Sequence, residues 1–362
     1  MDMNRRGFLR RVSRFAVAVT SMSAMPGSSR GAEAGKTTAP SIPIIDTHQH
    51  LWDLSRFKLP WLRPPLDRSF TPKDYADAVQ GLPVVKAVYM EVAVAREQRV
   101  QEAEYAIRLC KDTEGLTCAA VIAGSPVDDD FEPYVMRFRG SPYIKGVRGA
   151  LPSGERMNDK AIIRNLRLLG EMGLRFDLNV PPQSLTDAAR LVDQCPDTRF
   201  VLDHCGNADP VAFFAAGRTS PRPAQHSPEQ WKQGIDDLAA RRNVVCKISG
   251  IVDNVPGYVP TAEDVAPIVN HCFDAFGPGR VMFASDWPVC LIGMPLRDWV
   301  GLLTAVVAGR PEADRRKLFH DNAAAFYELD LENPRERRYN GTRQNDIEGK
   351  TTNLLRKEGD SP

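Results

Sequence analysis

Eight short apolar segments alternate with stretches of helical spacing along this chain, and no other feature limits its fold as strongly. Each segment is rich in Val, Ile or Phe and is bounded by Gly, Pro or Asp, which is typical of buried strands. They are Pro43–Thr47, Val84–Val92, Leu116–Ala123, Tyr143–Arg148, Leu174–Val180, Thr198–Asp203, Asn243–Ser249 and Arg280–Ser285. Strand followed by helix, repeated in this way, predicts parallel strands joined by right-handed crossovers.

The stretches between the segments have apolar residues at helical spacing. They are Arg96–Asp112, Lys160–Met172, Leu185–Gln194, Pro228–Arg241, Thr261–Phe276 and Leu296–Ala308. Eight strand–helix units close most naturally into a (β/α)8 TIM barrel, an α/β fold, which we expect over residues 42–330. The alternative is an open doubly wound sheet. That fold normally has a glycine-rich turn after its first strand, where this chain has Asp-Thr-His-Gln-His.

Two irregular segments and both chain ends fall outside this pattern. Trp52–Pro72 and Pro210–Pro228 are rich in proline and are expected to be loops, the first over the mouth of the barrel. Residues 331–362 are polar, without an apolar pattern, and are expected to form a tail.

The N-terminal segment, residues 1–34, has the features of an export signal. Arg5 and Arg6 precede Gly-Phe-Leu, as in a twin-arginine signal, and a short apolar stretch and a small-x-small cleavage sequence follow. The alternative is a basic arm on a cytosolic protein. The order of the three parts favours export to the periplasm, and we expect no stable membrane anchor after cleavage, because no apolar run reaches 18 residues.

Charge and cysteine content exclude several other classes. The chain has 47 basic and 46 acidic residues, a net charge of +1, and no basic block beyond its N-terminus, so nucleic acid is not an expected partner. Its 7 cysteines are an odd number without a C-x-x-C pair, which argues against a zinc ribbon and a disulfide framework. We expect several of them to be small buried apolar residues. The sequence is compatible with a homo-oligomer.

Residues suited to catalysis follow three of the predicted strands. His48 and His50 end the first strand, His204 follows the sixth and Asp286 the eighth. In extended backbone, residues two apart point to the same side, so the first two imidazoles can face one point. Because chemistry in such barrels gathers at the carboxyl ends of the strands, we expect all four side chains to meet.

This set suits water activation by either of two routes. His48, His50 and Asp286 could hold one divalent metal ion, zinc or manganese, that lowers the pKa of bound water. Without a metal, Asp286 or a neighbouring imidazole would take the proton directly. Arg148, near the end of the fourth strand, could stabilise an oxyanion or bind a substrate carboxylate.

Other residues are candidates for the pocket wall. Glu91 ends the second strand and could reach the site or form a salt bridge. Trp52, Trp61 and Trp287 could stack on a sugar-like ring or pack in the core. Lys247 is expected to be structural and His226 to lie at the surface.

Five motifs in order resemble the amidohydrolase superfamily, in its amidohydrolase-related ("amidohydrolase 2") branch. They are Ile-Ile-Asp-Thr-His-Gln-His-Leu-Trp at 44–52, Lys-Gly-Val-Arg-Gly at 145–149, Leu-Asp-His-Cys-Gly at 202–206, Cys-Lys-Ile-Ser-Gly at 246–250 and Phe-Ala-Ser-Asp-Trp-Pro-Val at 283–289. The chain is most similar to the sugar-acid lactonases and the pyrone-dicarboxylate lactonase of that branch. The resemblance implies that Asp286 activates the attacking water.

The chain departs from the two-metal members of the superfamily. Those have a bridging Lys or Glu after strand four and a His after strand five, whereas the fifth segment here, Leu174–Val180, contains no histidine. We therefore expect one metal ion or none. The expected function is hydrolysis of a lactone, a small-molecule substrate. A decarboxylase or C–N hydrolase of the same superfamily and an inactive barrel that binds a sugar acid or a protein remain as alternatives.

Overall fold

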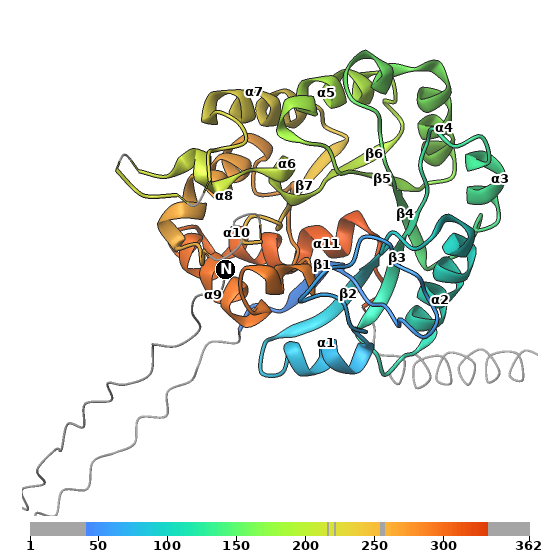
Figure 1. Ribbon diagram of the computed structural model, residues 1–362, viewed down its shortest axis with the longest axis horizontal. Coiled ribbons are helices and arrows are strands. Elements are labelled where there is room, and N and C mark those ends of the chain that lie inside the picture. The colour runs from blue at the N-terminus through green and yellow to red at the C-terminus, as the bar shows by residue number, and fades with distance from the viewer. Residues whose placement is uncertain (1–40, 216, 221, 254–257, 332–362) are drawn as a thin grey trace, which may run out of the picture. The chain divides into compact units, whose positions relative to one another are not determined.

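The computed structural model describes residues 41–331 except 216, 221 and 254–257 (Figure 1). The expected export signal, residues 1–34, and the expected tail, apart from Leu331, lie outside the described residues.

Within the described part of the chain, eight strands form a parallel sheet in which sequence neighbours are also spatial neighbours, from β1 to β8. The strands are β1 (Ile44–Gln49), β2 (Val84–Met90), β3 (Thr117–Ala123), β4 (Ile144–Arg148), β5 (Arg175–Leu178), β6 (Arg199–Leu202), β7 (Val244–Ile248) and β8 (Val281–Phe283). Each overlaps one of the eight apolar segments. The expected (β/α)8 barrel is confirmed.

Helices surround the strands, as Figure 1 shows. The α-helices of the described residues are α1 (Pro72–Ala78), α2 (Arg99–Lys111), α3 (Phe131–Met136), α4 (Lys160–Glu171), α5 (Leu185–Asp193), α6 (His204–Asn207), α7 (Pro228–Ala239), α8 (Ala262–Phe276), α9 (Leu296–Val306), α10 (Glu312–Arg316) and α11 (Asn322–Phe326). Short 3-10 turns are η1 (Arg96–Gln98), η2 (Gly154–Asn158), η3 (Pro182–Ser184), η4 (Pro210–Phe213) and η5 (Val289–Ile292), and η6 (Lys317–Asp321) is a π-helix. The helical stretches expected from the sequence became η1 with α2, and α4, α5, α7, α8 and α9.

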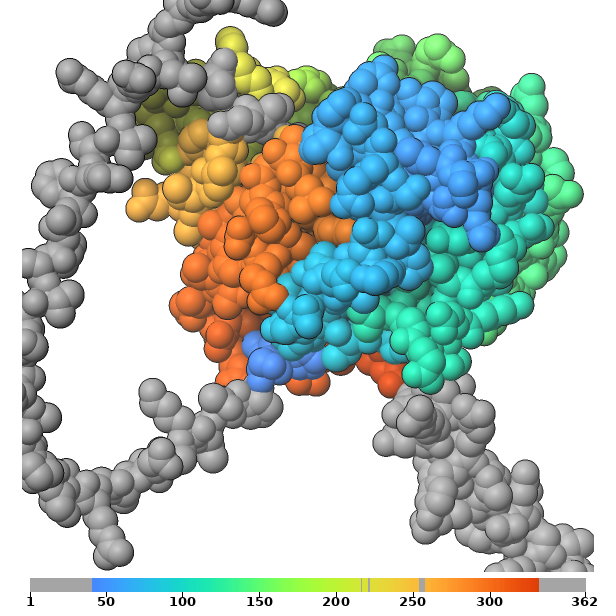
Figure 2. Space-filling view, turned by 60° about the horizontal axis from the view of Figure 1, so that its bottom comes forward, coloured from blue at the N-terminus to red at the C-terminus, as the bar shows by residue number. Residues whose placement is uncertain are grey.

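The barrel closes between β1 and β8 mainly through side chains. Asp46 accepts hydrogen bonds from the backbone N–H and the hydroxyl of Ser285, at 2.8 and 2.5 Å. Gln49 and Trp287 form an isolated parallel bridge, and the backbone N–H of His50 donates to the Trp287 carbonyl at 2.8 Å. On the face of the molecule shown in Figure 2, the blue-to-cyan N-terminal part of the barrel lies against the orange part that contains α9. The two strand ends that carry the imidazole pair and Asp286 are thereby fastened together.

Two apolar layers hold the strands. The larger lies between strands and helices and includes Tyr89, Phe176, Phe200 and Trp299. The smaller fills the barrel interior and is closed by residues of α11 and the turn after it. Its fully buried members are Ile45, Val88, Met90, Ala119, Val121, Val201, Met282, Ala323 and Tyr327. Strand alternation explains the division, because Val88 and Met90 face inward while Ala87 and Tyr89 face the helices.

Two further features complete the fold. No helix in residues 41–331, leaving aside positions 216, 221 and 254–257, has the length and apolarity to cross a membrane. The expectation that His226 lies at the surface is wrong. Its side chain is buried, and its Nε2 accepts a hydrogen bond from the backbone N–H of Asp209 at 2.8 Å, which joins the two ends of the proline-rich segment.

Candidate active site

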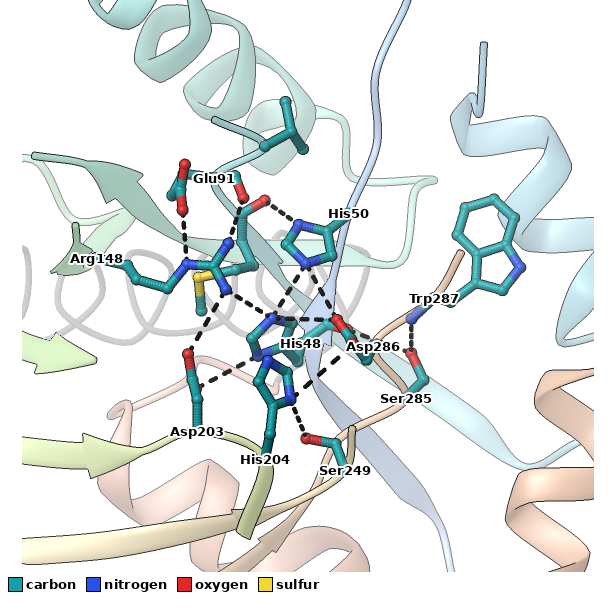
Figure 3. Close-up of polar contacts among 12 residues, drawn as sticks. His48, His50, Glu91, Arg148, Asp203, His204, Ser249, Ser285, Asp286 and Trp287 are labelled. Carbon is teal, nitrogen blue, oxygen red and sulfur yellow. Dashed lines mark hydrogen bonds and ion pairs between the residues drawn. The ribbon is translucent and has the colours of Figure 1, made fainter. Parts of the chain in front are cut away.

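The end of β1 supplies two imidazoles that meet at their Nε2 atoms. His48 Nε2 and His50 Nε2 lie 3.1 Å apart, as the alternation of strand side chains predicts (Figure 3). His50 Nδ1 lies 3.1 Å from the Met90 carbonyl. Because a carbonyl only accepts, this contact requires a proton on His50 Nδ1 and leaves Nε2 facing the site.

His48 has further polar contacts around its ring. Arg148 Nη1 lies 3.3 Å from His48 Nε2, and a guanidinium can only donate. His48 Nδ1 lies 3.5 Å from Asp203 Oδ1, an acceptor, and 3.4 Å from Lys247 Nζ, a donor. Burial holds the pKa of this imidazole well below 6.5.

Asp286 lies against both of these nitrogens. Its Oδ1 is 3.2 Å from His50 Nε2 and 3.5 Å from His48 Nε2. Burial opposes ionisation of Asp286, but the imidazoles of His204, His50 and His48 outweigh it and lower the pKa of the carboxyl below its usual value of 3.8. Asp286 has φ 56°, a left-handed conformation that is uncommon for a non-glycine residue and is frequent at functional sites.

His204 approaches from the opposite side, after β6. Its Nδ1 lies 3.0 Å from Ser249 Oγ and 4.0 Å from Asp286 Oδ2. The ring packs on Gly250, which has φ 61° and where an added Cβ would come 2.5 Å from His204 Cγ. Glycine is therefore required at 250, both for its backbone conformation and for the space that the imidazole occupies.

Arg148 and Glu91 reach the site together as an ion pair. Arg148 Nε donates to Glu91 Oε1 at 2.6 Å, and its Nη2 donates to the Glu91 carbonyl at 3.1 Å. Glu91 Oε2 in turn accepts from the backbone N–H of Ala93 at 2.7 Å. The guanidinium is thus held in place and largely neutralised before any substrate arrives.

A charged group lies below the imidazoles around Lys247, which the sequence analysis expected to be structural. Lys247 Nζ lies 2.5 Å from Asp177 Oδ2, 3.1 Å from Asp203 Oδ1 and 3.4 Å from His48 Nδ1, and Asp177, Asp203 and Lys247 are all fully buried. Burial opposes ionisation of Asp203, but Lys247 and His48 lower its pKa well below 3.8. The ionised Asp203 orients His48. The sequence held one signal for this role, because Asp203 directly precedes the predicted site residue His204.

The site residues that meet could hold one cation. Three potential ligand atoms, His48 Nε2, His50 Nε2 and Asp286 Oδ1, converge with separations of 3.1 to 3.5 Å. In a tetrahedral zinc site with bonds of about 2.0–2.1 Å, ligand atoms lie roughly 3.4 Å apart. Such crowding of lone pairs is repulsive unless a proton or a metal ion lies between them. The Met90 carbonyl that orients His50 is the outer partner that metal-binding histidines usually have.

A cavity of about 350 Å³ opens above these groups. His50, Arg148, His204 and Asp286 line it, together with residues from the surrounding loops. The loop residues are Trp61, Val92, Ala93, Asn179, Asn207, Gly250, Asp253 and Val289. Asp253 and Asn207 were not singled out as site residues from the sequence.

Two expected wall residues lie elsewhere. Trp52 and Trp287 are buried and do not line the cavity, so the expectation that they form its wall needs correction. Trp52 packs edge-on against Phe70 and donates its indole N–H to the Arg68 carbonyl. Trp287 packs against Phe70 and points away from the imidazoles in Figure 3. Trp61 is the tryptophan at the cavity.

A (β/α)8 barrel with imidazoles and a carboxylate at the carboxyl ends of β1, β6 and β8 has the layout of a hydrolase that activates water. The chain matches the amidohydrolase family model over residues 45–329 and belongs to that family. The resemblance drawn from the five motifs is thereby confirmed.

Similar proteins span the same region. The chain is 26% identical over 296 residues to an L-fucono-1,5-lactonase of Burkholderia multivorans, a match that covers 79% of this chain and 96% of the lactonase. It is 26% identical over 310 residues to the uncharacterized protein y4mH of Sinorhizobium fredii, covering 80% and 99%. A crystal structure of a Burkholderia multivorans amidohydrolase with bound zinc superposes with a TM-score of 0.67 at 24% identity, covering 80% of this chain and all of that one.

Proposed function

We propose that this protein hydrolyses an uncharged, polyhydroxylated lactone, with Asp286 as the acceptor of the proton of the attacking water. The observation that carries the proposal is the position of Asp286, ionised and surrounded by three imidazoles at the base of the cavity. The relatives named as lactonases support the reaction class.

The chemistry uses groups that line the cavity. Water attacks the lactone carbonyl carbon and gives a proton to Asp286. Arg148 and His204 are donors available to the oxyanion that develops on the carbonyl oxygen. When the ring C–O bond breaks, Asp286 returns the proton to the departing ring oxygen. The product is a hydroxy acid, and Asp286 is again an ionised carboxylate.

A metal ion at His48, His50 and Asp286 would complement this base. A carboxylate with a lowered pKa is a weak base and needs acidified water. A divalent ion bound by these three residues would polarise the carbonyl and lower the pKa of water. Zinc or manganese suits nitrogen and oxygen ligands of this kind.

The charges at the cavity favour an uncharged substrate over a dicarboxylate. Among the described lining residues Arg148 provides the only guanidinium or ammonium group, and Glu91 already pairs with it. Asp253 and Asp286 add carboxylates to the same wall. A substrate with two carboxylates would meet repulsion there without a free cation, whereas hydroxyl groups find acceptors and the amides of Asn179 and Asn207.

The test is a panel of lactones assayed by proton release in weakly buffered indicator. The panel contains aldonolactones of different ring size and lactones that carry one or two carboxylates. We expect turnover of the uncharged members and a fall in kcat of about 10²- to 10⁴-fold for Asp286→Asn. Asparagine is suited to a left-handed backbone, so the variant should retain the wild-type melting temperature. Wild-type turnover by a folded Asp286→Asn variant would remove the base role.

Metal content is measured on the same protein by elemental analysis, before and after chelation. We expect about one divalent ion per chain, with activity lost on chelation and restored on return of the ion. Full activity without metal would mean that Asp286 acts as the base without a metal ion. In that case a proton shared by His48 and His50 would lie between their Nε2 atoms. A wild-type protein inert toward every lactone but active in decarboxylation or C–N hydrolysis would select that alternative, and binding without turnover would select the inactive barrel.

A further inference from the structure

Three thiols converge directly behind His204, outside the cavity. Cys205 follows β6, Cys246 lies on β7 and Cys272 on α8, and all three are fully buried. Their Sγ atoms all lie within 4.8 Å of one another. The sulfurs of Cys205 and Cys246 each lie 3.7 Å from the same acceptor, the Lys247 carbonyl. Residues 67 positions apart in the chain thus bring their sulfurs to one point.

The other cysteines show no such convergence in the described part of the chain. Cys118 Sγ lies against the Ala87 carbonyl, and Cys195 Sγ lies against the Ile163 carbonyl and near Arg167. A buried cysteine of that kind is explained as a small apolar residue that fills space. Three sulfurs that face one another, in contrast, can act together as ligands of one metal ion.

The donor set selects the ion. Thiolate ligands favour soft metals such as Cu(I) and zinc. Structural zinc takes four ligands in a tetrahedron, and iron–sulfur clusters are held by four cysteines in most proteins. Among the described residues the group offers three sulfurs, and no fourth side chain of a His, Cys, Asp or Glu joins them within the same distance. Three sulfur ligands suit Cu(I), which does not require a fourth.

We propose that Cys205, Cys246 and Cys272 form a three-sulfur site for monovalent copper. Each thiol that becomes a thiolate on binding releases one proton, and the copper remains Cu(I), so no oxidant or reductant is needed. The bound ion joins the β6 loop, β7 and α8. Because Cys205 is adjacent to His204, it also restrains the backbone that positions this imidazole. The site does not depend on the proposed lactone hydrolysis.

The full burial of the sulfurs determines how the site is tested. Copper enters either during folding or through local opening, so the full-length protein is examined after growth in copper-supplemented medium and after anaerobic titration with the Cu(I)–acetonitrile complex. Bathocuproine disulfonate serves as a competing chelator. We expect one copper per chain that resists the competitor, a thiolate-to-copper absorption band and a sulfur-only first shell of three atoms by X-ray absorption. The melting temperature should rise when copper is bound.

Serine variants locate the site. Cys246→Ser and Cys272→Ser should each lose the tightly bound copper and the absorption band, whereas Cys118→Ser, outside the group, should retain both. Two cluster variants are used so that a folding defect in one leaves the other to decide. Three results would overturn the proposal: no copper by either route, copper retained in both cluster variants, or a mass lower by two hydrogens in a chain whose cluster cysteines are joined by a disulfide.

Discussion

Arg148 Nε lies 2.6 Å from Glu91 Oε1, and this ion pair neutralises most of the positive charge that Arg148 brings to the cavity. Both side chains are about nine-tenths buried, with 11% and 8% of their surface exposed, so solvent screens the pair only weakly. The guanidinium also contacts His48 Nε2 at 3.3 Å. Glu91 therefore links the selectivity of the cavity to the orientation of the imidazole pair.

Glu91→Gln tests this link. The amide keeps the size of the side chain but removes the charge that neutralises Arg148. We expect kcat/KM for a lactone with one carboxylate to rise about tenfold relative to an uncharged lactone, which corresponds to about 1.4 kcal/mol. Glu97→Gln, an exposed residue that loses the same charge, should leave the ratio unchanged. An unchanged ratio in Glu91→Gln would show that the pair does not select against anions.

The order of the strands and the histidine pair could be predicted because both follow from local patterns. Apolar segments bounded by turn residues mark the strands, and alternation within β1 brings His48 and His50 together. A common position at the carboxyl ends of strands was enough to group His204 and Asp286 with them.

The charged group at Lys247 could not be predicted in the same way. Asp177, Asp203 and Lys247 come from β5, from the residue after β6 and from β7, and their contacts depend on the tilt and stagger of the strands in the closed barrel. The sequence does not contain that geometry in any local pattern. Trp52 and Trp287 were misplaced for a related reason, since large aromatic residues suit a pocket wall and a core equally well.

The twin arginines provide a test of localisation. We propose that residues 1–34 direct export, and replacing Arg5 and Arg6 by lysine should retain the protein in the cytoplasm, because a twin-arginine pathway reads the arginine pair. Fractionation of cells followed by detection of the full-length and shortened chains measures the result. The control replaces Arg10 and Arg11 by lysine and keeps Arg5 and Arg6. It makes the same change of side chain at unchanged charge. Periplasmic recovery of the Arg5/Arg6 variant would show that export does not read this arginine pair, and a cytoplasmic wild-type protein would favour the basic arm of a cytosolic protein.

Glu102 predicts a pH-dependent loss of stability. Its carboxyl is buried in α2, where Oε1 accepts from the Val92 N–H at 2.6 Å and from the Tyr89 hydroxyl at 3.1 Å. Burial, and then the nearby Glu91 charge, raise the pKa of Glu102 to about 8. Between the usual value of 4.5 and about 8 the unfolded chain has released this proton while the folded protein keeps it. Stability from this group is therefore present at low pH and lost as pH rises, by at most about 1.4 kcal/mol per pH unit.

Chemical unfolding of Glu102→Gln from pH 5 to pH 8 measures this effect. The neutral amide does not titrate, so the free energy of unfolding of the variant should improve relative to wild type as pH rises. Glu104→Gln, exposed on the same helix, should follow the wild-type curve. If the free energies of unfolding of Glu102→Gln and wild type changed in parallel with pH, Glu102 would have the same pKa in the folded and the unfolded chain.

Gly250→Ala tests whether the packing of His204 is required for catalysis. The added Cβ would lie 2.5 to 2.6 Å from three atoms of His204, its Cγ, Cβ and Nδ1, and φ at 250 is 61°. The ring must shift, which removes it from Ser249 and Asp286, and we expect kcat/KM for the lactone to fall at least about tenfold. Gly173→Ala is the matched control, since Gly173 has φ 72° with nothing within 4 Å. It should lose about 1–2 kcal/mol of stability from the left-handed backbone alone and keep its activity. Equal kinetics in the two variants would mean that His204 tolerates displacement and is not needed near Asp286.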